Sequence, residues 1–249
     1  METWSLNLGE QFDAQHSYVV AASLPDGSEA VLKVNPQEPE TEFEGEAFER
    51  WDGIGAARVY AHDRERRALL IERLRPGTQG WELTDEEATA VGAGVLEQLW
   101  VPAGDPFVRL EDQAAYWAEF LPRHWDSLGR SFERSLVDEA VGFLREAGPT
   151  QRESVLLHQD LHAGNFLLSG RGWLAIDAKP LVGEREFDVA SLIRDRRPTT
   201  RAAMERRLDY LVERLDLDRD RVRGWGIAHA LAWNGSAQMV ECARLLAQS

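Results

Sequence analysis

Residues 156–165 read LLHQDLHAGN, and the polar side chains of this stretch are the starting point for predicting the fold. Asp160 precedes the amide of Asn165 by five residues, and the carboxylate of Asp177 follows twelve residues after that amide. Short apolar runs around a Gly-Arg-Gly turn predict buried strands at 155–157, 166–168 and 173–176. A loop then carries Asp160, and a hairpin returns Asp177 beside it.

This spacing suits the chemistry of phosphoryl transfer. An acceptor hydroxyl needs a carboxylate that orients it and accepts its proton, while a nucleoside triphosphate needs oxygen ligands that hold Mg²⁺ against its charge. We expect Asp160 to serve the hydroxyl, and Asn165 and Asp177 to bind the metal. The spacing therefore predicts a kinase that uses ATP and Mg²⁺.

His158, Asp160 and Asn165 resemble the His-x-Asp-x-x-x-x-Asn motif that aminoglycoside phosphotransferases share, in variant form, with protein kinases. Residues 176–184 read IDAKPLVGE, which is similar to the IDPKPLxGD segment of the streptomycin 6-kinase and hydroxyurea phosphotransferase branch. The chain departs from this segment by an alanine and a glutamate, Ala178 and Glu184. We expect these departures to bear on the substrate rather than on the reaction.

The resemblance extends over nearly the full length and implies a two-lobed, protein-kinase-like α+β fold. A small lobe of antiparallel sheet with one helix is expected over residues 1–76, where it binds ATP. A larger, mainly helical lobe is expected over residues 77–249, where it carries catalysis and the substrate site.

A metal-dependent hydrolase is an alternative interpretation of the same stretch, with His158, Asp160 and His162 as ligands. Such a site normally needs further ligands, yet the other histidines stand alone without ligand spacing, at His16, His62, His124 and His229. We expect His158 instead to brace the loop by hydrogen bonding.

The first third of the chain supplies a candidate phosphate-binding lysine. Residues 17–22 and 29–34 form a predicted hairpin through Pro25-Asp26-Gly27, and Lys33 lies among apolar residues of the second strand. Burying a lysine is costly unless its charge is used, which favours a contact with ATP phosphates. A lysine on an exposed strand face is the alternative.

The partner of Lys33 is expected on a helix over residues 40–51. Phe43, Ala47, Phe48 and Trp51 recur at helical spacing, and Glu44 falls within their stripe. We therefore predict an ion pair between Lys33 and Glu44. Glu46 is the fallback partner, and glutamates that only solvate the helix are the plain alternative.

Two more strands are predicted at 57–61 and 68–72, before a turn at Pro76-Gly77. The family resemblance implies that the segment after them is the hinge between lobes, where backbone groups bind the adenine edge. Three residues are expected to supply that contact: Glu72, Arg73 and Leu74.

Two further features separate this chain from protein kinases. Their Gly-x-Gly-x-x-Gly loop is missing, since Gly9 is the only glycine at 7–20, and Ser17 is a weak candidate for phosphate contact. Ten residues separate Asp177 from Asp188, too few for a peptide-docking activation segment, so a small-molecule acceptor is expected. Asp188 is expected to begin a helix and, by resemblance, to brace the catalytic loop.

The rest of the chain is helical in pattern. A capping box at Thr84 and Glu87 starts one helix, which runs to about residue 100. Further helices are predicted at 111–128, 132–147, 199–215, 220–232 and 234–247. The acceptor pocket is expected between the catalytic loop and the C-terminal helices, with loose candidates in Trp225, Trp233, Glu241 and residues 111–125.

The composition agrees with these predictions. The chain has 28 basic and 43 acidic side chains, which gives a net charge of −15. This charge disfavours binding of nucleic acid and suits a cationic acceptor, although acidic side chains also serve solubility. One cysteine, Cys242, and the lack of a signal peptide or long apolar run favour a cytoplasmic protein without a membrane segment. The basic cluster at 194–197 is expected to be solvated, with contact to phosphate as the alternative, since it lies near the site.

The sequence thus predicts an ATP-dependent O-phosphotransferase for a small molecule, most simply an aminoglycoside such as streptomycin. A kinase for a sugar or amino sugar is one alternative, because acceptor pockets vary while phosphate machinery does not. A nucleotide-binding pseudokinase is another. The oligomeric state and the hydroxyl that is phosphorylated stay open.

Overall fold

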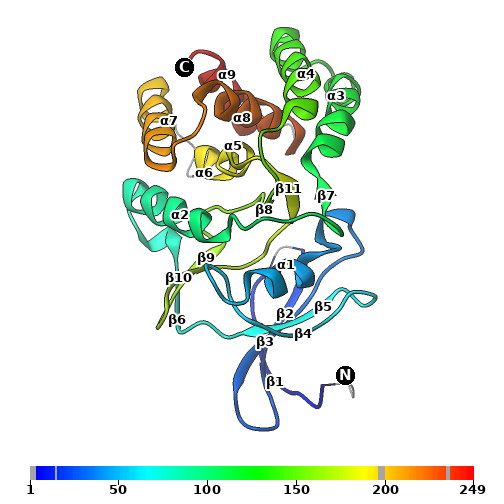
Figure 1. Ribbon diagram of the computed structural model, residues 1–249, viewed down its shortest axis with the longest axis vertical. Helices are drawn as coiled ribbons and strands as arrows, with labels where there is room; N and C mark the ends of the chain where they lie inside the picture. The colour runs from blue at the N-terminus through cyan, green and yellow to red at the C-terminus, as the bar shows by residue number, and fades with distance from the viewer. Residues whose placement is uncertain (1–3, 15, 196–199, 234–235) are drawn as a thin grey trace.

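The computed structural model describes residues 4–14, 16–195, 200–233 and 236–249. An antiparallel sheet with one helix lies at one end of the molecule, most of the helices lie at the other end, and short strands lie between them (Figure 1). The expected α+β class with a sheet lobe and a helical lobe is confirmed.

The N-terminal sheet has five antiparallel strands in the order β1-β2-β3-β5-β4. The β2–β3 turn forms as its sequence predicts, because Asp26 accepts a hydrogen bond from the Ser28 N–H at 2.9 Å and Gly27 adopts a φ of 87°. Lys33 lies in a central strand, paired with Val19 and Leu69. The strands are Asn7–Gln11 (β1), Tyr18–Ser23 (β2), Glu29–Val34 (β3), Val59–Asp63 (β4) and Ala68–Glu72 (β5).

The helix expected at 40–51 is shorter than predicted. A 3-10 turn, η1 (Pro39–Thr41), comes first, and the α-helix α1 (Glu44–Trp51) begins after Phe43, whose φ of −110° and ψ of 21° are not helical. The apolar stripe of α1 is buried as predicted, and the Trp51 indole donates to the Leu99 carbonyl at 2.8 Å. The helix is thereby fastened to the second half of the chain.

Two small sheets form the centre of the molecule. One has the order β10-β9-β6, and the other has the order β7-β11-β8. Strand β8 and the β9–β10 hairpin were predicted, whereas β6, β7 and β11 were not. The strands are Pro76–Gln79 (β6), Val108–Arg109 (β7), Val155–Leu157 (β8), Phe166–Ser169 (β9), Gly172–Ala175 (β10) and Leu181–Gly183 (β11).

The helices follow the predicted periodicity closely. Thr84 and Glu87 form the predicted capping box of α2. The predicted helix starts at residues 199 and 234 lie outside the described residues. No helix within the described ranges is long and apolar enough to cross a membrane. The helices are Asp85–Leu99 (α2), Leu110–Ser127 (α3), Arg134–Ala147 (α4), Arg185–Asp188 (α5), Ala190–Arg194 (α6), Arg201–Leu215 (α7), Arg219–Trp233 (α8) and Ala237–Ala247 (α9), with 3-10 turns at Gly80–Glu82 (η2) and Gly148–Thr150 (η3).

Two helical glycines test how tightly α1 is seated. A Cβ on Gly45 would lie 2.4 Å from the Nδ1 atom of His62, whereas a Cβ on Gly142 in α4 would meet nothing within 4 Å. Gly142→Ala is expected to raise the free energy of unfolding by about 0.5–1 kcal/mol through helix propensity. Gly45→Ala is expected to lower it by about 1–3 kcal/mol through overpacking. Urea unfolding of both variants measures the difference, and equal gains would contradict the close seating of α1.

Candidate active site

Lys33 is the centre of a buried polar cluster. Its ammonium donates to both carboxylate oxygens of Glu44, at 2.7 and 2.9 Å, and to the carboxylate of Asp177. The Asn35 amide donates to Glu44 at 2.5 Å, and the Ser17 hydroxyl donates to Asn35 at 2.7 Å. The structure thus brings together the lysine and glutamate predicted from the sequence, and it engages Ser17 through Asn35.

The charges of this cluster depend on one another. Burial alone would lower the pKa of Lys33, but the negative charges of Glu44 and Asp177 outweigh burial and raise that pKa above its usual value. Burial likewise opposes ionisation of Asp177, yet the positive charge of Lys33 outweighs it and holds the Asp177 pKa below its usual range. Lys33 and Asp177 are therefore both charged at neutral pH.

Asn165 and Asp177 are drawn together by the strands that follow and precede them. The Ile176 N–H donates to the Asn165 carbonyl at 2.9 Å, and Asp177, at a φ of 61°, turns back toward Lys33. The Asn165 amide group donates to the Asp160 carbonyl at 2.9 Å, which leaves its Oδ1 as the ligand atom. With the Asp177 side chain 46% exposed, this amide-carboxylate oxygen pair fits a hard divalent cation.

Asp188 fixes the backbone of the catalytic loop. Its carboxylate accepts hydrogen bonds from the N–H groups of His158 at 3.0 Å and Gln159 at 2.7 Å, and from the Trp100 indole at 3.0 Å. Burial raises the pKa of Asp188 to about 6, although these three donors pull it down. Contrary to prediction, Asp188 ends the short α5 instead of beginning a helix, because the chain re-enters helix only at Ala190.

His158 is buried and neutral. Its Nε2 lies 3.0 Å from the Ile176 carbonyl oxygen, and its Nδ1 accepts from the Asp160 N–H at 3.3 Å, so the proton belongs on Nε2. Trp51 stacks on the ring at 6.1 Å between centroids. Burial lowers the pKa of His158 to about 4, against the opposing attraction of Asp160. Both ring nitrogens are used within the loop, as expected for a brace.

The hydrolase alternative finds no support in this geometry. His162 uses its Nδ1 to accept from the Gly164 N–H at 3.0 Å. Within the described part of the chain, no three His, Cys, Asp or Glu side chains gather as metal ligands.

The Asp160 carboxylate has cationic neighbours that the sequence did not assign to it. Arg194 lies 2.5 Å from its Oδ1 atom, and Lys179 lies 3.7 Å from its Oδ2 atom. Both cations lie over the ring of Trp233, at 4.7 and 4.2 Å from the centroid. Arg194 is therefore not simply solvated, and Trp233, one of the loose acceptor candidates, reaches this region. The rest of the basic cluster, at 196–197, lies outside the described residues.

The predicted hinge residues have mixed surroundings. The Glu72 N–H donates a hydrogen bond to the Arg58 carbonyl at 2.8 Å, and the Glu72 carboxylate pairs with Arg171 at 2.5 Å. The Arg73 guanidinium pairs with Glu10 at 3.3 Å, and the Leu74 side chain is buried in the core. The Glu72 N–H is therefore used within the sheet lobe, and the adenine contact of Glu72, Arg73 and Leu74 stays a prediction.

Two other acceptor candidates serve packing. Trp225 is fully buried, and its indole donates to Glu184 at 2.5 Å, while Glu241 pairs with Arg244 at 3.1 Å on the surface. Glu184 also pairs with Arg221 at 2.7 Å. These contacts place Trp225 in the core of the helical lobe.

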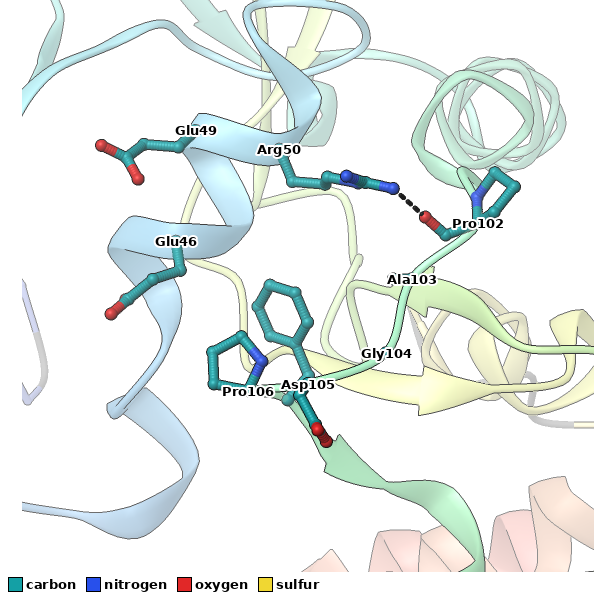
Figure 2. A pocket seen from close by; sticks show the side chains of 9 residues that line it. Glu46, Glu49, Arg50, Pro102, Ala103, Gly104, Asp105 and Pro106 are labelled. Carbon is teal, nitrogen blue, oxygen red and sulfur yellow. Dashed lines mark hydrogen bonds between the residues drawn. The ribbon is translucent and has the colours of Figure 1, made fainter.

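An open cavity of about 580 Å³ lies on the opposite side of α1 from Glu44. Glu46, Glu49 and Arg50 line one wall, and residues 102–107 line the other, with Arg50 donating to the Pro102 carbonyl at 2.6 Å (Figure 2). Of the candidates predicted from the sequence, Glu46, the fallback partner of Lys33, lines this cavity, whereas Lys33 itself pairs with Glu44.

Three features define a small-molecule kinase. They are the sheet lobe with its buried lysine-glutamate pair, the braced loop that carries Asp160, and the short chain between Asp177 and Asp188. The family model described as "Aminoglycoside/hydroxyurea antibiotic resistance kinase" matches residues 4–239. The chain belongs to this family.

Curated relatives agree with this membership. The chain is 33% identical over 268 residues to a streptomycin 6-kinase of Streptomyces glaucescens, covering 100% of this chain and 86% of the relative. It is 33% identical over 240 residues to a hydroxyurea phosphotransferase of Kitasatospora aureofaciens, covering 93% of this chain and 69% of the relative.

Solved structures share the fold. An aminoglycoside phosphotransferase in complex with ADP and hygromycin B aligns with a TM-score of 0.66 at 17% identity, covering 100% of this chain and 96% of that one. A choline kinase from Streptococcus pneumoniae aligns with a TM-score of 0.65 at 12% identity, covering 98% and 95%.

The neutral state of His158 gives a pH prediction. The folded chain holds its imidazole neutral down to about pH 4, whereas an unfolded histidine takes up a proton below about pH 6.5. The stability this provides is complete above pH 6.5 and is lost as the pH falls toward 4. The difference in unfolding free energy between wild type and His158→Gln should therefore shrink by about 1.4 kcal/mol for each pH unit below about 6. Urea unfolding across this range measures it, and a constant difference would contradict a neutral buried ring.

Proposed function

We propose that this kinase transfers the γ-phosphoryl group of ATP to a hydroxyl of an aminoglycoside, with streptomycin as the first candidate, and thereby inactivates the antibiotic. The observation that carries the proposal is the joint placement of Asp160, Asn165 and Asp177 around one loop and hairpin, next to the Lys33–Glu44 pair. Relatives named streptomycin 6-kinase support the choice of acceptor.

The residues divide the work of an in-line transfer. Asp160 orients the acceptor hydroxyl and takes its proton, while Lys33, fixed by Glu44, holds phosphate oxygens. Asn165 Oδ1 and the Asp177 carboxylate would hold Mg²⁺, which when bound neutralises charge on the phosphates. Asp188 and His158 keep the loop in the geometry that this division requires.

The acceptor is expected to be cationic. A chain with a net charge of −15 attracts cations over long range. The carboxylates of Asp160 and Glu40 are already paired with Arg194 and Lys179, so this expectation rests on the long-range field. ATP is negatively charged and is repelled by this field, so its binding depends on Lys33 and on the Mg²⁺ that accompanies the ATP.

Asp160→Asn keeps the shape of the side chain and removes the base. It is expected to lower kcat by about 10²–10⁴-fold while leaving the KM for ATP nearly unchanged. Asp126→Asn is a matched control, because Asp126 also pairs with an arginine, Arg130 at 3.0 Å, but on the exposed end of α3. Coupled measurement of ADP release tests both variants, and near-normal turnover by Asp160→Asn contradicts its role as base.

The acceptor is tested by ADP release with Mg-ATP across streptomycin, other aminoglycosides, hydroxyurea, amino sugars and simple sugars. Turnover with streptomycin and loss of its antibiotic activity support the proposal. Turnover only with hydroxyurea, as the name of one relative suggests, or only with a sugar, overturns the acceptor and retains the mechanism. Nucleotide binding without turnover of any acceptor indicates a pseudokinase.

A further inference from the structure

Lysine is almost absent from this chain. Of the 28 basic residues, 26 are arginine and only two, Lys33 and Lys179, are lysine. Arginine therefore serves nearly every surface ion pair and every basic helix position, and lysine is confined to two places. The guanidinium of arginine is planar and donates hydrogen bonds in a fixed forked geometry, whereas the ammonium of lysine is a compact charge with three N–H donors. The two positions share a need for the second kind of cation.

Both lysines lie at the catalytic cluster. Lys33 contacts Asp177, and Lys179, two residues further along the chain than Asp177, lies 3.7 Å from Asp160. The Lys179 N–H donates to the His158 carbonyl at 3.1 Å, which fixes its backbone to the base of the catalytic loop. Lys179 thus lies between the carboxylate expected to bind metal and the carboxylate expected to bind the acceptor.

The side chain of Lys179 is held in place but not saturated. Its ammonium lies 3.0 Å from Glu40 in η1 and 4.2 Å from the centre of the Trp233 ring. Its distance of 3.7 Å from Asp160 exceeds that of a hydrogen bond, and the other Asp160 oxygen is taken by Arg194 at 2.5 Å. The side chain is 18% exposed, so it is not sealed from solvent.

We propose that Lys179 is a second phosphate-binding lysine and a catalytic residue, which donates hydrogen bonds to the γ-phosphoryl group as it passes to the acceptor at Asp160. The inference rests on the proposed kinase function and deepens it. The acceptor oxygen forms a bond to phosphorus, the bond from phosphorus to the ADP oxygen breaks, and the hydroxyl proton goes to Asp160. Lys179 makes and breaks no covalent bond, and its charge offsets the negative charge on the oxygens in transfer.

The scarcity of lysine makes a direct test available. In an acyl phosphate of ATP, the γ-phosphate carries an acyl group, which a neighbouring lysine amine attacks to form an amide while ATP departs. Peptide mass spectrometry is expected to find the acyl group on Lys179, in wild type and in Lys33→Arg, and to find it suppressed by AMP-PNP. Acylation of Lys33 alone overturns the inference and leaves nucleotide binding intact. Acylation of neither lysine overturns nucleotide binding and the inference together.

Variants separate a catalytic contact from a structural one. Lys179→Met keeps the length of the side chain over Trp233 and is expected to lower kcat by about 10²-fold, with the KM for ATP changed less than about threefold. It is also expected to lose about 10²-fold in affinity for MgADP with aluminium fluoride, which imitates the phosphoryl group in transfer, but not for MgADP alone. Lys179→Arg should recover part of both losses.

Arg134→Met is the matched control, because Arg134 also lies over a tryptophan, Trp125 at 5.2 Å, and pairs with a carboxylate, Asp138 at 2.8 Å, on the remote α4. It is expected to leave kcat and both affinities unchanged. Two results for Lys179→Met overturn the inference. One is an equal loss of affinity for MgADP with and without aluminium fluoride. The other is an unchanged kcat, provided that the variant unfolds thermally like the wild type.

Discussion

The ammonium of Lys33 is buried between carboxylates from two distant parts of the chain, and the relation between the sheet and the catalytic hairpin depends on it. Glu44 belongs to α1, while Asp177 follows β10, 133 residues further along. Removing one partner of a buried ion pair costs about 3–5 kcal/mol, because the remaining charge is left uncompensated. One cation therefore positions α1, the central strand β3 and the turn at Asp177 together.

The catalytic loop depends on two buried groups whose protonation the fold shifts in opposite directions. Asp188, with a pKa of about 6, gains protons in the folded chain before the unfolded one, so its ionisation costs stability as the pH rises from about 4 to 6. His158, with a pKa of about 4, resists protonation in the fold, so its contribution grows over the same range. The contributions of the two groups to stability therefore vary with pH in opposite directions.

Sequence reasoning located the elements that local pattern determines. Spacing identified Asp160, Asn165 and Asp177, and a helical stripe selected Glu44 from several glutamates. It could not find the break before α1, which depends on the irregular backbone at Phe43. It also could not find the convergence of Lys179, Arg194 and Trp233 on Asp160, because tertiary packing brings these residues together from three separate segments. Two sequence signals could have pointed to Lys179, which are its place in the segment IDAKPLVGE and the scarcity of lysine in the chain.

The two departures from the family segment, Ala178 and Glu184, both lie in the interior of the protein. Ala178 is 1% exposed in the core, and Glu184 is fully buried against Arg221 and Trp225. Burial raises the pKa of Glu184, while the hydrogen bond from Arg221 opposes that rise, so this carboxylate is bound to the interior of the helical lobe. A residue enclosed in this way cannot touch an acceptor at Asp160. Trp233 and Glu40, by contrast, border the loop through their contacts with Lys179, whose ammonium lies 3.7 Å from Asp160.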